Sequence, residues 1–233
     1  MSLVSAQAAA LGQRERNKLD KLRRIKGAAR ELFIAKGFDD TTTREIALQA
    51  GVGIGTIFVY AENKRDLLFL IVNEELEKVE QMAETAIEEA ASLLENLMRV
   101  AQIHYDFFAQ QPALSRLVLR EMVFYESGTQ AGRFQRTRER LIDLLGRIVA
   151  TARAHKTIVA SEEPRFIGWT VFSVFQVELR RWLSNDHLDL EHGLQTLERG
   201  LRLVITGLAP TKAALKVATR NNRSVLKGLS RRS

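Results

Sequence analysis

The pattern between residues 42 and 68 is the most specific in the chain, and the chemistry that it predicts is recognition of DNA. Thr42 precedes Glu45 by three residues, the spacing of a capping box, so a helix is expected to begin there. Gly51 ends that helix, and a second short helix is expected over residues 54–60. Two short helices joined by such a turn form a helix-turn-helix, whose second helix enters the major groove. Residues 54–60 are therefore the expected recognition helix.

Histidines and carboxylates are the other residues that could carry chemistry, as metal ligands or acid-base groups. Of the histidines at 104, 155, 187 and 192, only the last two share a segment, DHLDLEH at 186–192. Asp and His near a helix junction more often cap helices or face water, and no motif accompanies them. Seven glutamates between residues 74 and 89 spread around a helix without a converging histidine, which favours a solvated face. We therefore expect that the protein is not an enzyme and that it has no metal site and no cofactor.

The charge is divided unevenly along the chain, whose formal net charge is +7. Residues 1–66 hold 12 Lys and Arg against 8 Asp and Glu, residues 67–206 hold 16 against 20, and residues 207–233 hold 7 against none. A basic head, an acidic middle and a basic tail fit a protein whose ends meet polyanions. Basicity alone does not separate DNA from RNA or from an acidic membrane surface.

The composition favours a folded, soluble protein of the cytoplasm. There is no cysteine, which excludes a disulfide framework and suits a reducing compartment. The longest uncharged apolar run, at residues 166–177, has 12 residues, against the roughly 20 that are needed to span a bilayer. The first residues lack the pattern of a secretory signal. We therefore expect no membrane association.

Helical periodicity continues along the whole chain, and no stretch alternates like a strand. A basic amphipathic helix is expected to end at Lys36 and Gly37, and a helix capped by Asn63 is expected to run to about residue 90. Five further helices are expected at about 92–109, 112–125, 129–154, 162–184 and 189–206. The fold class that this pattern predicts is all-α.

Residues 24–68 resemble the tetracycline-repressor (TetR) family of bacterial regulators. The resemblance lies in RIKGAARELFIAKGF, TTREIALQAGVGIGTIFVY and NKRDLL, which agree in order and spacing. It implies an all-α protein of about nine helices, with a three-helix head and a helical body. The expected division is a flexible arm at 1–13, a DNA-binding head at 14–66, a ligand-binding and dimerisation body at 67–207, and a basic, disordered tail at 208–233 that could add nonspecific DNA affinity.

The resemblance also implies which residues contact DNA. Phosphate contacts fall at Thr42, Thr43, Tyr60 and Lys64, and Arg44 is either a base contact or a plain exposed charge. The recognition helix presents Gly53, Ile54, Gly55, Thr56 and Val59. Phe58 stands where the family commonly has Tyr, so it is expected to pack rather than to reach a phosphate. Because this face is apolar and rich in glycine, contacts to thymine methyl groups and DNA shape are expected to outweigh hydrogen-bond readout.

Aromatic and Met side chains on the central helices are the candidates for a ligand pocket. Each alone is most simply a core residue, but in a body of this family they are the expected lining of a pocket for an apolar or amphipathic molecule. The candidates are His104, Phe107, Phe108, Met122, Phe124, Tyr125, Trp169, Phe172, Phe175 and Gln176.

The helix around residues 166–177 is apolar nearly all round, which predicts burial on more than one side. Together with the last helix, through Leu194, Leu197, Leu201, Val204 and Ile205, it is the expected contact of a homodimer that binds a pseudo-palindromic, double-stranded DNA operator. The expected function is a transcriptional repressor that a small-molecule effector releases from its operator. The alternative is a dimeric DNA-binding regulator or architectural protein without an effector.

Overall fold

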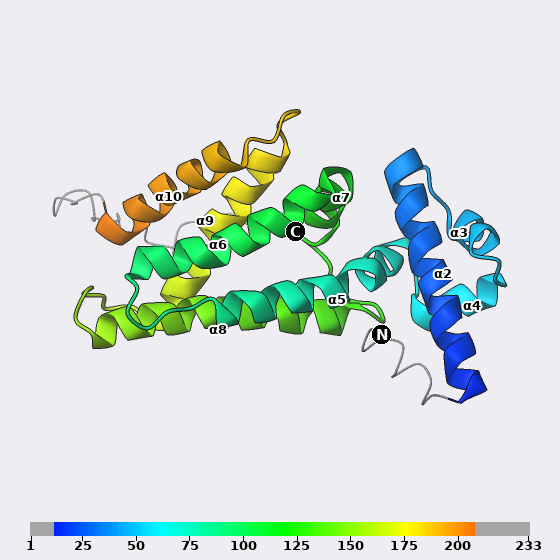
Figure 1. Ribbon diagram of the computed structural model, residues 1–233, viewed down its shortest axis with the longest axis horizontal. Coiled ribbons are helices and arrows are strands. Elements are labelled where there is room, and N and C mark those ends of the chain that lie inside the picture. Colours follow the sequence, from blue (N-terminus) through cyan, green and yellow to red (C-terminus); the bar gives the residue numbers. More distant parts are fainter. Residues whose placement is uncertain (1–11, 208–233) are drawn as a thin grey trace, which may run out of the picture.

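The computed structural model describes residues 12–207, and the regular structure in that range is helical. The order is α2 (Gln13–Lys36), α3 (Thr43–Gln49), α4 (Ile54–Tyr60), α5 (Lys64–Thr85), α6 (Leu93–Gln110), α7 (Pro112–Glu121), α8 (Ala131–Ala154), α9 (Pro164–Leu183) and α10 (Leu190–Thr206) (Figure 1). The predicted all-α class and the count of nine are confirmed over this range. Most of the predicted arm and the whole of the predicted tail at 208–233 lie outside the described residues.

Helices α2 to α4 form a head at one end of the molecule, and the long α5 leads from it into the body (Figure 1). The capping box is present, because the Glu45 amide donates to the Thr42 hydroxyl and the Thr42 amide donates to the Glu45 carboxylate. Gly51 adopts a φ of 60°, which favours glycine, and ends α3 as predicted. Arg24 from α2 donates to the carbonyl oxygen of Ala50 at 2.8 Å and so fixes the turn before the recognition helix.

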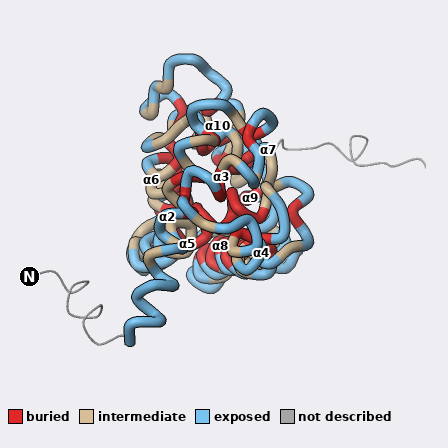
Figure 2. Tube along the Cα trace, turned by 90° about the vertical axis from the view of Figure 1, so that its right-hand side faces the viewer, coloured by how far each residue is buried: buried red, intermediate tan, exposed pale blue. Residues whose placement is uncertain are grey.

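In the body α8 packs against both α5 and α9, with α6, α7 and α10 beside them. Figure 2 shows the buried positions gathered where α5, α8 and α9 pass through the interior. α8 and α9 approach closely at two glycines, since a Cβ atom on Gly168 would lie 2.6 Å from the backbone nitrogen of Gly146. Within the described part of the chain no helix is long and apolar enough to cross a membrane.

Two helices end earlier than the periodicity predicted. α5 stops at Thr85 because the side chain of Asn96 pairs with the backbone of Glu88 and fixes a turn there. α7 stops at Glu121, and Tyr125 lies in the following loop, where its hydroxyl is bound by another part of the chain.

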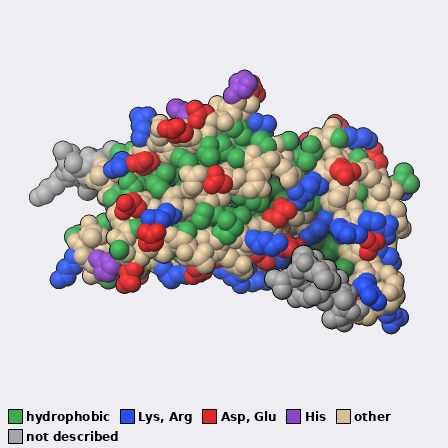
Figure 3. Space-filling view, viewed as in Figure 1, with side chains coloured by type: hydrophobic (Ala, Val, Ile, Leu, Met, Phe, Trp, Pro, Cys, Tyr) green, Lys and Arg blue, Asp and Glu red, His purple; other side chains and the backbone are tan. Residues whose placement is uncertain are grey.

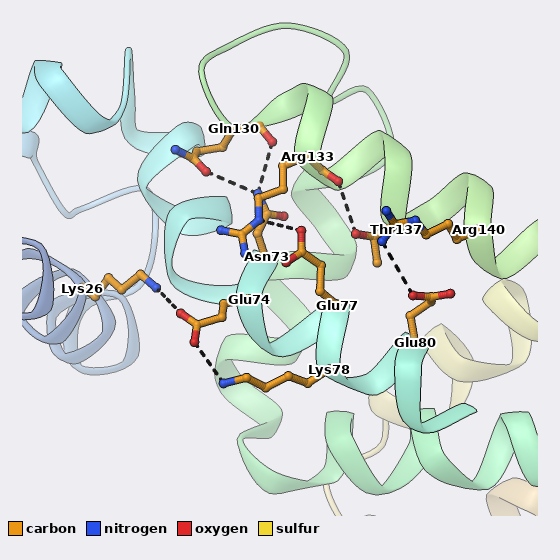
Figure 4. Close-up of polar contacts among 10 residues, drawn as sticks. All are labelled: Lys26, Asn73, Glu74, Glu77, Lys78, Glu80, Gln130, Arg133, Thr137 and Arg140. Carbon is orange, nitrogen blue, oxygen red and sulfur yellow. Dashed lines mark hydrogen bonds and ion pairs between the residues drawn. The ribbon is translucent and has the colours of Figure 1, made fainter. Parts of the chain in front are cut away.

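Glu74 and Glu84 on the acidic side of α5 are exposed, as expected of a solvated face, but several of its glutamates also form ion pairs with basic residues of other helices. Glu74 lies between Lys26 of α2 and Lys78, and Glu77 receives two hydrogen bonds from Arg133 of α8 (Figure 4). Glu80 is buried, with Arg140 at 4.0 Å. The periodicity of α5 could not show that basic residues of α2 and α8 face it.

Candidate DNA-binding head and ligand cavity

One side of the recognition helix α4 is buried in the head, and the other side is exposed to solvent. Ile57 and the following Ala61 are buried in the head, whereas Ile54, Phe58 and Val59 are exposed. The prediction that Phe58 packs is wrong, because 52% of its surface is accessible. The exposed face therefore carries one more apolar side chain than the sequence suggested, and an aromatic one.

Two of the predicted phosphate contacts, Thr42 and Thr43, lie at the start of α3. Thr43 is the first residue of α3 and is half-buried, and Arg44 after it is exposed. The Thr42 hydroxyl also donates to Glu45 at 2.9 Å, so it is engaged in the cap. The hydrogen bond from Lys36 and those from Thr42 hold the pKa of Glu45 down at about 2, which keeps this carboxylate ionised.

Lys64 and Tyr60 complete the predicted set at the other end of α4. Tyr60 is half-buried as the last residue of α4, and Lys64 is the first residue of α5. The Lys64 ammonium donates to the carbonyl oxygen of Asp39 at 2.9 Å and lies 4.6 Å from the centre of the Phe38 ring. Gly53, Gly55 and Thr56 form the first turn of α4, which begins without a side-chain cap. Figure 3 shows Lys and Arg side chains gathered over the head.

A buried carboxylate joins the head to the body. Asp66, in the first turn of α5, is fully buried and accepts hydrogen bonds from the Tyr125 hydroxyl and from the backbone amides of Glu62, Thr129 and Gln130. The predicted cap is also present, because Asn63 accepts from the Asp66 amide. The sequence pattern gave no sign of the role of Asp66 at this junction.

The loop after α7 is shaped to reach Asp66. Gly128 has a φ of 126°, and a Cβ atom there would lie 2.4 Å from the Asp66 carboxylate. The Tyr125 ring stacks on Phe69 of α5 with ring centres 4.0 Å apart. α7 itself also holds the head, since Arg120 binds Asp39 with two hydrogen bonds of 3.0 and 3.2 Å.

The body contains a small inner cavity of about 40 Å³ between α5, α6, α7, α8 and α9. Five of the predicted pocket residues line it: His104, Phe108, Met122, Phe172 and Gln176. The remaining lining residues are Leu76, Glu80, Val118, Phe134, Thr137, Arg138 and Leu141. The structure thus brings half of the predicted set together at one place.

A larger outer cavity of about 310 Å³ lies between α5, α6 and α7. Phe107 and Phe108 line it together with apolar residues such as Val79, Ile103 and Leu114. Phe108 and Val118 line both cavities and therefore form the wall between them. Figure 3 shows hydrophobic side chains along the body between α5 and α6.

The other pocket candidates lie elsewhere. Phe124 is 81% exposed in the loop after α7, and Tyr125 is bound at the head-to-body junction. Phe175 packs its ring against His104 and Tyr105 in the core behind the inner cavity. Trp169 is 44% exposed on α9. Aromatic residues that are close in sequence point in different directions. Their positions in the sequence did not show which of them line a cavity and which face the core or solvent.

The outer face of α9 is apolar and exposed in the single chain. Phe166, Trp169 and Val177 of α9 are exposed, as is Leu203 of α10. The α10 residues named by the sequence are only partly available, because Leu197 and Leu201 are buried within the chain itself, where α10 packs on α6 and α9. Residues not predicted from the pattern, above all Leu203, supply the exposed part of α10.

The segment 186–192 caps a helix, as the sequence indicated. The Asp189 carboxylate accepts from the His192 amide at 2.9 Å, and His187 and His192 are both exposed. Over residues 12–207, no group of three or more His, Asp or Glu side chains is arranged to hold a metal ion.

A helix-turn-helix head joined to a helical body is an arrangement that DNA-binding regulators use. Residues 25–71 match the family of bacterial regulatory proteins, tetR family. This match identifies residues 25–71 as a TetR-family DNA-binding head.

The chain is similar to the fatty acid metabolism regulator protein of Bacillus subtilis (strain 168), with 25% identity over 197 residues that cover 83% of this chain and 98% of the relative. Two solved structures share the fold. FadR from Bacillus subtilis in complex with stearoyl-CoA matches 80% of this chain and 98% of its own, with a TM-score of 0.64 and 23% identity. FadR from Thermus thermophilus in complex with lauroyl-CoA, a TetR-family repressor, matches 84% of this chain and 99% of its own, with a TM-score of 0.62 and 23% identity.

Proposed function

We propose that this chain is a homodimeric repressor that a long-chain acyl-CoA releases from a pseudo-palindromic DNA operator. In this proposal residues 14–66 bind DNA, and residues 67–207 bind the effector and form the dimer. The observation that carries the proposal is the pair of adjoining apolar cavities next to the helix that holds the head. The solved relatives in complex with stearoyl-CoA and lauroyl-CoA support the choice of effector class.

The cavities suit an acyl chain rather than a compact polar metabolite. The outer cavity of about 310 Å³ is lined mainly by aliphatic and aromatic side chains. Each methylene group that a chain buries there contributes roughly 0.8 kcal/mol. The inner cavity, at about 40 Å³, takes part of a chain only after Phe108 or Val118 moves. Effector binding in the inner cavity therefore requires a change in the body.

That change reaches the head through α7. Val118 lies on α7 and Met122 follows its last residue, and both line the inner cavity. The same helix binds the head through Arg120 and Asp39. If the acyl chain enlarges the cavity, α7 shifts against α5 and alters the orientation of the head. The effector then binds the DNA-incompetent state more tightly, with a coupling free energy of about 1–3 kcal/mol.

A second copy of the chain is the proposed partner of the exposed face on α9 and α10. Phe166, Trp169, Val177 and Leu203 give this face a hydrophobic character that is typical of the core of a homodimer interface. A two-fold dimer places two α4 helices on half-sites separated by one DNA turn, roughly 34–36 Å, or a multiple of it.

Operator binding in the presence of defined thioesters tests the proposal. Genomic fragments that the purified chain selects supply the operator, and fluorescence anisotropy measures its affinity with dodecanoyl-CoA, octadecanoyl-CoA, free dodecanoate and CoA. We expect at least one acyl-CoA to weaken operator binding by about 10-fold or more, and CoA alone to have no effect.

A cavity-filling variant adds a structural control. Val118→Trp blocks the shared wall and should reduce the acyl-CoA response, whereas Val159→Trp places the same side chain at a fully exposed position and should preserve it. Unfolding curves of both variants show whether overpacking has changed stability.

The effector-free regulator is the second candidate, and the small volume of the inner cavity favours it. Its own side chains nearly fill that space. Operator affinity that no acyl-CoA alters, together with no thermal stabilisation by any of them, would select this alternative.

A further inference from the structure

The inner cavity is apolar on most sides but contains five polar side chains. Leu76, Phe108, Phe134 and their neighbours form the apolar lining. The polar side chains come from four helices: Glu80 from α5, His104 from α6, Thr137 and Arg138 from α8, and Gln176 from α9. A cavity for a hydrocarbon chain alone does not need polar side chains. Polar atoms that lack a hydrogen-bond partner therefore indicate which polar group a ligand would carry.

Gln176 presents a buried acceptor that has no partner. The residue is 9% exposed, and its Oε1 atom is fully buried without a hydrogen bond from any described residue. A buried amide oxygen in this state is disfavoured unless water or a ligand donates to it.

His104 presents a second acceptor. Its Nδ1 atom lies 2.8 Å from the carbonyl oxygen of Val100, and because a carbonyl only accepts, Nδ1 carries the proton. Burial lowers the pKa of His104, so the ring is neutral and Nε2 keeps an unprotonated lone pair.

Glu80 adds a buried carboxyl group. Burial, followed by repulsion from Glu84, raises its pKa. The nearest cation is Arg140, whose Nη1 atom is 4.0 Å away and whose side chain is exposed. This carboxyl group therefore disfavours a ligand that places another negative charge in the cavity.

Arg138 supplies the complementary donor. Its Nε–H is buried without a partner among the described residues, and its Nη2 atom is 3.6 Å from Glu139. Thr137 is already engaged, since its hydroxyl donates to the carbonyl oxygen of Arg133 at 3.3 Å. Among the described residues, the cavity therefore offers a ligand several hydrogen-bond acceptors and one donor, the Nε–H of Arg138.

We propose that the inner cavity binds a hydroxyl group carried on the acyl chain of the effector, so that the preferred effector class is hydroxyacyl-CoA. This inference rests on the proposed function and narrows it. A hydroxyl hydrogen satisfies the acceptor of Gln176 or His104, while the hydroxyl oxygen accepts from Arg138. A saturated chain in the same place leaves these groups unpaired, and a terminal carboxylate meets Glu80.

The volume agrees with a single small polar group. A cavity of about 40 Å³ holds roughly one water molecule, which is close in size to a hydroxyl. The methylene groups before it have room in the outer cavity, which is separated only by Phe108 and Val118. The hydroxyl group replaces a water molecule that would otherwise satisfy these polar atoms.

The test compares matched thioesters on the full chain by calorimetry. The ligands are dodecanoyl-CoA and its 2-, 3- and 12-hydroxy derivatives, so that only the position of one hydroxyl changes. We expect at least one hydroxy derivative to bind about 5-fold more tightly or better than dodecanoyl-CoA. Equal or weaker binding of all three would overturn the inference while leaving the proposed function intact. No binding of any thioester would overturn both.

Two variants test whether Gln176 and Arg138 cause the preference for a hydroxyl group on the acyl chain. Gln176→Met keeps side-chain length and Arg138→Met keeps an unbranched apolar stem while removing the guanidinium group. At least one of them should reduce the preference to less than 2-fold while retaining affinity for dodecanoyl-CoA. Phe172→Leu, a purely apolar change in the same lining, should weaken all four ligands alike. A preference that survives in both Met variants, with unfolding curves like the wild type, would show that the hydroxyl binds elsewhere.

Discussion

The Tyr125 hydroxyl donates a hydrogen bond to the buried Asp66 carboxylate, across the junction between the loop after α7 and the first turn of α5. The carboxylate also accepts hydrogen bonds from the backbone amides of Thr129 and Gln130, which directly precede α8. Two helix starts therefore converge on one negative charge, where their partial positive charge and free amides stabilise it. The head is fixed to the body by this group.

Loss of the Tyr125 hydroxyl should loosen that junction. Tyr125→Phe keeps the stack on Phe69 but removes a donor from a buried carboxylate, which should lower the free energy of unfolding by about 1–3 kcal/mol. Operator affinity should fall as well, while acyl-CoA affinity changes little. Chemical denaturation, anisotropy and calorimetry measure the three quantities.

Tyr105→Phe is the matched control for that variant. The Tyr105 hydroxyl is buried and has no hydrogen-bond partner among the described residues, so its removal should be neutral or slightly stabilising. Equal destabilisation by both changes would mean that the Asp66 contact has no special role.

Lys64 should contribute one phosphate contact. Lys64→Met keeps an unbranched apolar side chain but removes the ammonium group that lies over the Phe38 ring, so the slope of log K against log salt should become shallower by about one. Lys78→Met, which removes a lysine of the body that pairs with Glu74, should leave the slope unchanged. Identical slopes for wild type and Lys64→Met would remove Lys64 from the DNA contacts.

A charge at the centre of the exposed α9 face should prevent dimerisation. Trp169→Glu buries an unpaired carboxylate in the proposed interface, so light scattering coupled to size exclusion should report a monomer at concentrations where the wild type is a dimer. The operator affinity should fall with it. Val159→Glu, at a fully exposed position outside α9, should remain a dimer; a dimeric Trp169→Glu protein would place the interface elsewhere.

Acid should remove the contribution of Glu45 to the stability of the head. Because the folded-state pKa lies near 2, below the ordinary value of 4.5, the carboxylate stabilises the fold fully above pH 4.5. This contribution is lost as the pH falls through about 2. The difference in Tm between wild type and Glu45→Gln should therefore be constant above about pH 5 and shrink toward pH 2. A difference that does not change with pH would assign the effect to packing.

The local features of the head and the all-α class could be predicted from the amino-acid pattern. Thr42 and Glu45, the stop at Gly51, and the cap at Asn63 depend on residues three or four positions apart. Their backbone geometry follows from side-chain chemistry within one helical turn, so pattern alone predicted them. The apolar recognition face was likewise visible, although the exposure of Phe58 was not.

The contacts between residues far apart in the chain could not be predicted in this way, because they depend on how the helices pack. Asp66 and Tyr125 are 59 positions apart, and helical periodicity states which face of a helix is buried but not what covers it. For the same reason Phe108 lines two cavities while Phe124 faces solvent. The polar lining around Gln176 likewise arises from four helices that converge. Local chemistry sets the elements, whereas their packing sets the junction and the cavities.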